Sequence, residues 1–292
     1  MGCKSIDYNY FMQILSFRDE VIGFLRSQGI EFADDGNLLR FPSKHLDLVL
    51  VPLPSSNIEG HREQQSTVFL YEDRWRCSQS VTSQRLMARL GKFRRIYARL
   101  CKVVSESNCM EYGFIPDSFK EKLKKFLDTY HTYGFLKGQK NYALVYKENI
   151  VAASQFMRTY RPQNSEPPIP FEYEWTRFAS LPDVRIAGGM GKILEQFVRD
   201  VRFKHNDEGF EIMSYSDNEW GEGDVYRKLG FELAGNVPPV VYHIDPQTFR
   251  RINPRQWSLL LRKATKRDIA LMPLEQYPVI RNQGSLKWKK LY

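Results

Sequence analysis

Apolar residues follow a helical spacing in three stretches of the first half of the chain and an alternating one between them. The helical spacing predicts helices over residues 17–28, 81–90 and 118–130. Runs rich in β-branched and aromatic residues, interrupted by Pro42 and Pro52, predict strands. These strands are expected at residues 37–41, 45–51, 66–71 and 94–104.

The second half of the chain alternates strands with helices. Residues 142–146 and 150–156 flank a short polar turn, which predicts a hairpin. A strand over 171–178 then leads through a glycine-rich turn into a helix, a strand over 211–218 and further elements up to Tyr242. This order predicts an α/β (α+β) fold, in which a mixed sheet carries helices on its faces.

The glycine-rich turn is the most informative feature of the sequence. It reads Arg185-Ile186-Ala187-Gly188-Gly189-Met190-Gly191-Lys192 and opens a helical run. The first N–H groups of a helix have no partner inside it and lie at the positive end of the helix dipole. Such a turn favours a bound pyrophosphate, because the amides and the dipole both attract negative charge.

Several motifs follow the order found in a family of phage proteins called homing-endonuclease-like. The resemblance is carried by Tyr71-Glu72-Asp73-Arg74-Trp75, Ile96-Tyr97-Ala98-Arg99-Leu100-Cys101, Glu174-Trp175-Thr176-Arg177-Phe178, Ser214-Tyr215-Ser216-Asp217, Tyr226-Arg227-Lys228-Leu229-Gly230-Phe231 and Gly284-Ser285-Leu286-Lys287-Trp288. It implies a restriction-endonuclease-like domain followed by a GNAT-like acyltransferase domain, similar to the Mom-type proteins that modify phage DNA bases. We expect a degenerate endonuclease-like domain over residues 1–92, a GNAT-like domain over 93–245 and a basic extension over 246–292.

In GNAT enzymes the glycine turn cradles the pyrophosphate of acetyl-CoA, so the resemblance implies acetyl-CoA or a related acyl-CoA as cofactor. Met190 stands where GNAT enzymes prefer Gly or Ala, and its larger side chain would narrow the seat. The residues expected to bind the cofactor are Arg185, Gly188, Gly189, Met190, Gly191 and Lys192.

The first domain departs from the family at its second metal ligand. Asp47 matches the first carboxylate, whereas Glu59 lies in a polar loop rather than on the adjacent strand. A metal-dependent nuclease holds its carboxylates together around the ion. We therefore expect this domain to fold without binding metal or cutting DNA.

Two residues are candidates for acid and base work. The resemblance implies that Tyr226 protonates the departing CoA thiolate, and the alternative is an aromatic residue packed under the cofactor. Glu174 lies on the strand before the glycine turn, where it would take a proton from an attacking amine. As a strand residue next to Trp175, it can equally face solvent.

Five further residues are candidates for binding the substrate. Ser214, Asp217 and Trp220 fall at the end of a strand, where open α/β sheets place ligands, and Trp220 suits either base stacking or a core. Arg177 suits a phosphate or a salt bridge with a carboxylate such as Asp217. His131 follows a helix, where a capping role competes with a catalytic one.

Composition points to an anionic partner. The 292 residues contain 43 Lys and Arg against 34 Asp and Glu, a formal net charge of +9, which favours nucleic acid. Basic residues alternate with aromatic ones after Pro246, and this pattern suits phosphate contacts with base stacking as well as a solvated cover over the sheet. The predicted DNA contacts are Arg250, Arg251 and Arg255.

The remaining signals exclude other classes. The four cysteines lack CxxC spacing, so a structural zinc site is not expected and a reduced setting is natural. No apolar run is long enough to cross a bilayer, and residues after Met1 do not resemble a secretory signal. We expect a cytoplasmic protein without membrane association, in the host cytoplasm if a phage encodes it.

These signals favour a phage acyltransferase that acts on an exocyclic amine of a DNA base. Two alternatives stay open at this point. One is a DNA-binding protein in which both catalytic sites have decayed, and the other is an active homing-type endonuclease. Neither the acyl donor nor the oligomeric state follows from the sequence.

Overall fold

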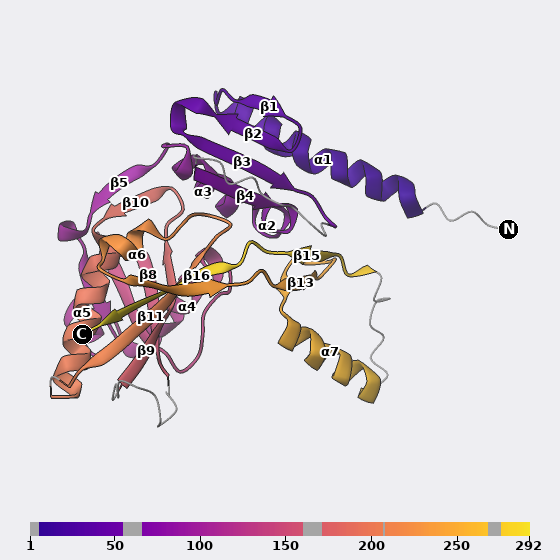
Figure 1. Ribbon diagram of the computed structural model, residues 1–292. Helices are drawn as coiled ribbons and strands as arrows, with labels where there is room; N and C mark the ends of the chain where they lie inside the picture. The colour runs from indigo at the N-terminus through magenta and orange to yellow at the C-terminus, as the bar shows by residue number, and fades with distance from the viewer. Residues whose placement is uncertain (1–5, 55–65, 160–170, 207, 268–275) are drawn as a thin grey trace. The chain divides into compact units, whose positions relative to one another are not determined.

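The computed structural model describes residues 6–54, 66–159, 171–206, 208–267 and 276–292, with side chains except over 6–16 and 263–267. Figure 1 traces its helices and strands. Glu59 lies outside the described residues.

The chain divides into two compact units whose segments interleave. Unit 1 comprises residues 1–83, 217–222 and 237–285, and unit 2 comprises residues 84–216, 223–236 and 286–292. The sequence analysis expected three consecutive segments instead. The difference arises because the region after residue 246 does not form an extension: it supplies strands to both units.

Unit 1 contains two small sheets. Its elements are α1 (Ile6–Ser27), β1 (Ala33–Asp35), β2 (Leu38–Phe41), β3 (Leu46–Val51), β4 (Ser66–Tyr71), α2 (Glu72–Cys77), the start of α3 (Gln79–Arg89), β13 (Val241–Ile244), β14 (Arg251–Ile252), α7 (Pro254–Arg267) and β15 (Val279–Arg281). One sheet has the order β1-β2-β3-β4 and the other β14-β13-β15. Phe69 and Tyr71 of β4 pack with Ile244 and Ile280 of the second sheet, so one apolar cluster joins the two.

Unit 2 is built around a seven-stranded sheet of order β12-β16-β11-β9-β8-β7-β6. Its elements are β5 (Arg94–Tyr97), the 3-10 turn η2 (Ala98–Leu100), β6 (Lys102–Ser105), α4 (Pro116–Tyr130), β7 (Lys140–Tyr146), β8 (Asn149–Thr159), β9 (Phe171–Ser180), β10 (Val184–Ala187), α5 (Gly189–Lys204), β11 (Phe210–Asp217), α6 (Asp224–Lys228), β12 (Glu232–Val237) and β16 (Ser285–Leu291). The sheet is mixed, since β9 and β11 are parallel whereas β6 to β9 are antiparallel. The predicted α/β fold is confirmed.

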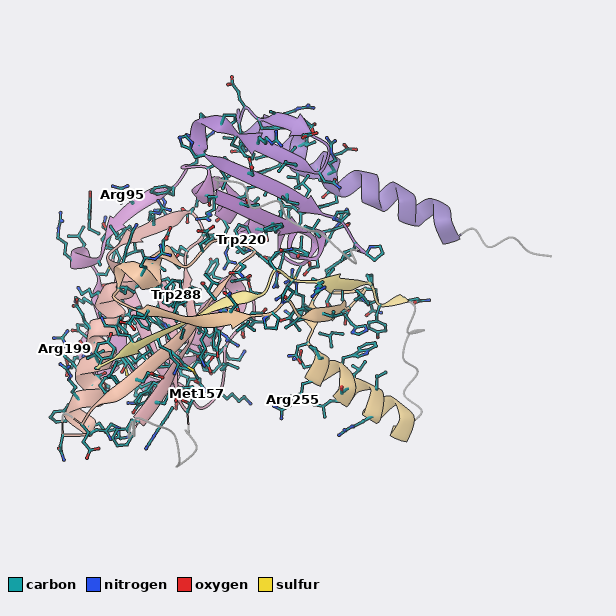
Figure 2. The ribbon with its side chains drawn as sticks, in the orientation of Figure 1. Arg95, Met157, Arg199, Trp220, Arg255 and Trp288 are labelled. Carbon is teal, nitrogen blue, oxygen red and sulfur yellow. The ribbon has the colours of Figure 1, made fainter. Side chains whose placement is uncertain are left out.

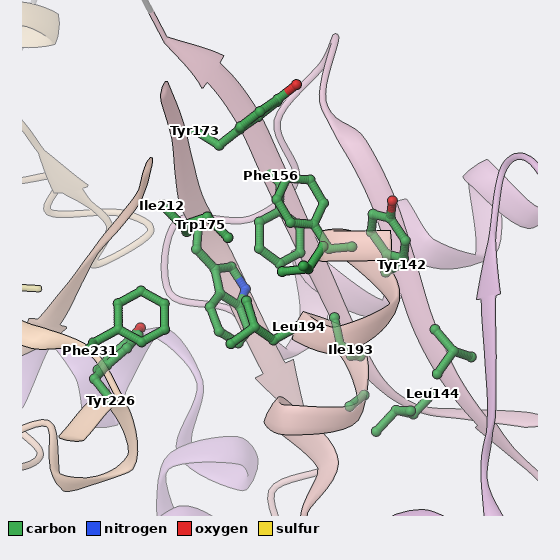
Figure 3. Packing of buried hydrophobic residues seen from close by; sticks show 14 of the residues in the cluster. Tyr142, Leu144, Phe156, Tyr173, Trp175, Ile193, Leu194, Ile212, Tyr226 and Phe231 are labelled. Carbon is green, nitrogen blue, oxygen red and sulfur yellow. The ribbon is translucent and has the colours of Figure 1, made fainter. Parts of the chain in front are cut away.

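Alternation along the central strands places one helix on each face of this sheet. Leu144 of β7 belongs to the cluster under α5, and its neighbours Ala143 and Val145 belong to the cluster under α4. Figure 3 shows the α5 side, where Phe156 and Trp175 stack with ring centroids 5.0 Å apart. The strand period of two therefore produces two buried layers.

The single strand expected over residues 94–104 is wrong. The 3-10 turn η2 divides it into β5, which pairs in parallel with β10, and β6, which pairs with β7 of the main sheet. Ala98 is buried inside this turn, so the apolar alternation continues through a change of sheet. No described helix is long and apolar enough to span a membrane.

Candidate functional site

The site in unit 2 begins where two parallel strands separate. The pairing of β9 with β11 ends at Trp175 and Ser214, although β9 continues to Ser180 and β11 to Asp217. Beyond this branch point each strand has lost the other as a ladder partner. Ligands bind outside the carboxyl ends of parallel strands in open α/β sheets. The fork between β9 and β11 is therefore the place where a ligand can enter the sheet.

The glycine turn lies directly after β9 and β10, at the start of α5. Gly188 adopts φ +78° as the N-cap, a backbone conformation that glycine takes without strain. The first bond inside the helix runs from the N–H of Lys192 to the carbonyl of Gly188, at 3.0 Å. Among the described residues, the N–H groups of Gly189, Met190 and Gly191 have no backbone partner. This helix start provides the amide seat that the sequence predicted.

Packing explains the second glycine and places the methionine. A Cβ on Gly189 would lie 2.9 Å from Cγ2 of Ile186 and 3.1 Å from Cδ1 of Leu144, so the helix begins against the sheet with no room for a side chain. Met190 packs against the same apolar cluster. Met190 is partly buried there, and the narrowing of the seat expected from its size stays a prediction.

Lys192 and Arg185 flank the turn in different ways. The ammonium of Lys192 donates to the carbonyls of Ala98 at 3.0 Å and Cys101 at 2.5 Å, which fastens η2 onto α5. Lys192 thus has a structural role in holding η2 against α5, and its contact with phosphate stays a prediction. Arg185 is exposed on β10, with its guanidinium 4.6 Å from the centre of the Phe93 ring.

Tyr226 lies at the branch point of the fork. Its hydroxyl is 2.8 Å from Oγ of Ser214, which in turn donates to the carbonyl of Trp175 at 3.0 Å. The ring is stacked on Trp288 and is edge-on to Trp175 (Figure 3 shows Tyr226 beside Trp175). Burial raises the pKa of Tyr226, and the hydrogen bond with Ser214 opposes that rise. The phenol therefore keeps its proton at neutral pH.

Trp288 of β16 lies against Tyr226, next to the branch point. Its indole N–H donates to Oγ of Ser216 at 2.9 Å, and the side chain is buried. A Cβ on Gly223 would lie 2.6 Å from both Oγ of Ser216 and Nε1 of Trp288. Sequence reasoning did not assign Trp288 or Gly223 to the site, because their role depends on a strand from the far end of the chain.

A polar cluster lies beside the fork, on β9 and the segment after α4. Burial raises the pKa of Glu174, while Arg177 and Lys287 act in the opposite direction. Nε of Arg177 donates to the carbonyl of Gly134 at 3.0 Å, and the guanidinium lies 5.6 Å from the centre of the Tyr133 ring. Tyr215 of β11 is part of the same environment, because Glu174 raises its pKa after the larger effect of burial. A partly buried carboxylate thus stands among aromatic and basic groups.

Three candidate substrate-binding residues remain, which are His131, Asp217 and Trp220. His131 accepts a hydrogen bond from the N–H of Tyr133 at Nδ1, at 3.1 Å, so it caps the segment that holds Tyr133 and Gly134. Asp217 and Trp220 belong to unit 1, where Oδ1 of Asp217 accepts from the N–H of Glu219 at 2.9 Å. Burial lowers the pKa of Arg177, and the carboxylate of Glu174 acts in the opposite direction.

The prediction that Arg251 contacts DNA is wrong. Its side chain is 2% exposed and forms ion pairs with Oδ2 of Asp73 at 2.8 Å and Oε1 of Glu219 at 2.5 Å. Both carboxylates are fully buried, so unit 1 contains an internal charge cluster. The guanidinium also lies 4.8 Å from the centre of the Tyr71 ring. Arg250 and Arg255 are exposed, and Figure 2 shows Arg255 on α7.

Asp47 is placed on β3, where it is buried and its Oδ1 has no hydrogen-bond partner in the described structure. Glu59, which stands for the second carboxylate ligand of a nuclease metal ion, lies outside the described residues. Within those residues no group of three His, Cys, Asp or Glu side chains is arranged to hold a metal ion.

No family model and no curated protein matches the chain. Solved structures resemble it distantly. A GNAT family acetyltransferase from Elizabethkingia anophelis with acetyl-CoA bound is 12% identical, covering 57% of this chain and 81% of its own, with a TM-score of 0.29. An acetyltransferase from Bacillus subtilis in complex with CoA is 15% identical, with 65% and 97% covered and a TM-score of 0.30. A GNAT family protein from Desulfovibrio desulfuricans is 14% identical, with 47% and 89% covered and a TM-score of 0.29.

Similarity at this level says nothing about the chemistry of this chain, which rests on its own residues. The fork, the helix start and the Tyr226–Ser214 pair all belong to unit 2. Unit 2 therefore brings together the separation of two parallel strands, a helix start whose first amides have no backbone partner in the described structure, and a protonated phenol.

Proposed function

We propose that the chain is a GNAT-type acyltransferase that uses acetyl-CoA or a related acyl-CoA and modifies an exocyclic amine of a DNA base. The observation that carries the proposal is the fork between β9 and β11, which has Tyr226 at its branch point and opens beside the start of α5. Mom-type DNA modification is supported by the sequence resemblance and by the basic charge of the chain.

The residues at the helix start fit the phosphates of such a donor. The amides of Gly189, Met190 and Gly191 would hold the pyrophosphate, with Arg185 adding a positive charge beside them. When bound, the donor supplies an acyl group activated as a thioester.

Glu174 and Tyr226 perform the two proton transfers that the reaction requires. Glu174 accepts a proton from the acceptor amine as its nitrogen attacks the acyl carbon, and Tyr226 donates a proton to sulfur as the carbon–sulfur bond breaks. The raised pKa of each group suits its task, since a carboxylate with a raised pKa is a stronger base and a phenol with a raised pKa stays protonated. The products are the acylated amine and a free thiol, and the proton taken up by Glu174 returns through solvent to the Tyr226 phenolate, so protons and bonds balance.

Removing the Tyr226 hydroxyl tests this assignment. Tyr226→Phe keeps the ring against Trp175 and Trp288, and we expect it to lower kcat by about 100-fold or more while acetyl-CoA affinity in calorimetry changes little. The matched control is Tyr142→Phe, which also removes a buried hydroxyl, here bonded to Asp200 at 2.7 Å, and should leave kcat unchanged. Activity is read as a mass increase in DNA incubated with acetyl-CoA and the protein.

Two outcomes would sink the proposal. The first is the absence of heat at millimolar acetyl-CoA with folded protein. The second is a Tyr226→Phe rate equal to that of wild type. The alternative of a DNA-binding protein without catalysis predicts DNA binding with no acetyl-CoA heat and no mass increase.

One observation favours the nuclease alternative. The buried Oδ1 of Asp47 on β3 has no hydrogen-bond partner in the described structure, as is expected of an atom that binds a metal ion. We propose that unit 1 is a relic of a nuclease and does not cut DNA.

A further inference from the structure

Residues 92–102 contain five basic residues and no acidic one. They are Lys92, Arg94, Arg95, Arg99 and Lys102. The segment includes β5, η2 and the first residue of β6, and β5 pairs in parallel with β10, the strand that leads into the glycine turn. A strongly basic segment is thus fixed next to the seat at the start of α5.

Strand geometry sorts these residues onto two faces. Ile96 and its partner Ile186 point inward, where Ile96 is buried in the core and Ile186 packs against it. Side chains alternate along a strand and partners in a parallel pair share a face, so Phe93, Arg95 and Tyr97 point outward with Arg185 beside Arg95. Figure 2 shows Arg95 on the outer side of β5.

The charges on this outward face are not compensated by acids. Arg94, on the other face, pairs with Asp183 at 2.8 Å. In contrast, Arg95, Arg99 and Arg185 have no carboxylate within ion-pairing distance among the residues that the structure describes. Arg95 and Arg185 instead share the ring of Phe93, with guanidinium carbons 5.9 and 4.6 Å from its centre.

Like charges placed opposite each other on a sheet are unfavourable unless an anion lies between them. The aromatic residues on this face are positioned for a second kind of contact. Tyr97 is 42% exposed, and the guanidinium of Arg99 lies 4.6 Å from the centre of its ring. The exposed ring of Tyr97 beside uncompensated cations matches the two requirements of single-stranded nucleic acid, which are phosphate neutralisation and base stacking.

We propose that the outward face of β5, η2 and β10, formed by Phe93, Arg95, Tyr97, Arg99 and Arg185 and here called the basic strip, binds a single-stranded segment of DNA. The phosphates lie on the arginines, and an unpaired base stacks on Tyr97. The inference deepens the DNA-directed part of the proposed function and rests on it. Because the strip runs into the glycine turn through β10, a strand bound there leads toward the fork that holds Tyr226.

The test uses the full chain with Arg95 and Arg99 both changed to Glu, and fluorescence anisotropy with a short labelled oligonucleotide at several salt concentrations, without acyl-CoA. We expect Kd to rise at least about tenfold and the log–log salt slope to fall by about 1.4, since each phosphate contact on a single strand contributes about 0.7. The matched control, Lys120→Glu with Lys125→Glu on exposed positions of α4, lowers the formal net charge by the same amount and should change Kd less than about threefold.

Tyr97 provides the second arm. Tyr97→Ala should weaken single-strand binding about tenfold and duplex binding much less, whereas Tyr97→Phe should restore it, because stacking needs the ring and not the hydroxyl. An equal loss of DNA affinity in the strip variant and the control variant would overturn the proposal. An equal effect of Tyr97→Ala on the affinities for single-stranded and duplex DNA would overturn it too.

Acetyl-CoA calorimetry on the same variants separates this inference from the proposed function. Loss of acetyl-CoA affinity with intact DNA binding would assign the strip to the nucleotide part of the donor and overturn the proposal. A chain that binds no acetyl-CoA but shows strip-dependent DNA binding would end the acyltransferase proposal and keep this one.

Discussion

Two regions of this chain alternate basic and aromatic residues, and they use their charges in opposite ways. In the C-terminal region, Arg251 is buried between Asp73 and Glu219, Lys289 pairs with Glu211 at 2.5 Å, and Lys290 donates to the carbonyl of Leu229 at 2.7 Å. In the basic strip, Arg95, Arg99 and Arg185 lie outward over aromatic rings instead.

The difference shows that the same basic pattern is neutralised in one region and uncompensated in the other, according to the acids that the fold brings to it. Both regions look alike along the sequence, where local composition is all that is visible. The acids that neutralise the C-terminal region come from α2, β11 and the segment after β11, which are distant in sequence. Within the strip, β5 pairs with β10, which places Arg185 beside Arg95.

The largest expected effect comes from breaking the buried cluster of unit 1. Arg251→Met leaves Asp73 and Glu219 buried with the longer contacts to Arg74, at 4.0 and 3.9 Å, and removing one partner of such a cluster costs about 3–5 kcal/mol. This loss of stability should appear as faster hydrogen exchange in peptides from unit 1. The neighbouring exposed Arg250→Met should change stability by less than about 0.5 kcal/mol. Equal effects of the two substitutions would contradict the contrast between buried and exposed arginines.

A smaller effect is expected from pH. Burial, and after it the charge of Asp217, raises the pKa of Glu219 to about 7, while Arg251 and Arg74 oppose the rise. Between the ordinary carboxyl pKa and this value, the folded state binds more protons than the unfolded state, so stability falls as pH rises through that window. The fall should exceed about 1 kcal/mol, since one unit of pKa difference is worth about 1.4 kcal/mol.

Comparison with Glu219→Gln isolates this effect. The amide cannot titrate, so the variant should lack the part of the pH dependence that belongs to Glu219. Denaturant unfolding of both proteins at pH 5 and pH 7.5 measures the difference. A wild type whose stability rises relative to the variant over this range would refute the raised pKa.

The smallest effect is expected from the exposed arginines of the C-terminal region. Arg250→Glu with Arg255→Glu should change Kd for single-stranded DNA less than about threefold, because two exposed charges outside the strip act only through the general field of the protein. Anisotropy at fixed salt measures this against the strip variant. A loss equal to that of Arg95→Glu with Arg99→Glu would return DNA binding to the C-terminal region.

The order of helices and strands could be predicted from periodicity, since each central strand alternates and each covering helix has a clear apolar face. Two features of the fold could not. The turn η2 keeps the apolar alternation of its neighbours, so the change of sheet between β5 and β6 leaves no local signal. The interleaving of the units depends on long-range strand pairing, which no window of sequence contains.

The glycine turn could be predicted because its chemistry is local: the backbone of Gly188 and the helix after it define the seat. The contact between Ser214 and Tyr226 was not predicted, because the sequence analysis assigned Ser214 to substrate binding and Tyr226 to proton donation separately. Trp288 could not be assigned, because its contact with Ser216 joins residues 72 positions apart. Arg251 was misread for the same reason, since its partners lie far away in sequence.

The position of β16 has a consequence for the order in which this protein can assemble during translation. The strand lies between β11 and β12, and Tyr292 exchanges both backbone hydrogen bonds with Phe210. A nascent chain that has emerged only as far as β12 therefore presents two unpaired strand edges and lacks Trp288 beside the fork. The sheet of unit 2 is completed only after β16 has left the ribosome. The site therefore forms late in translation, when nearly all of the described chain has been made.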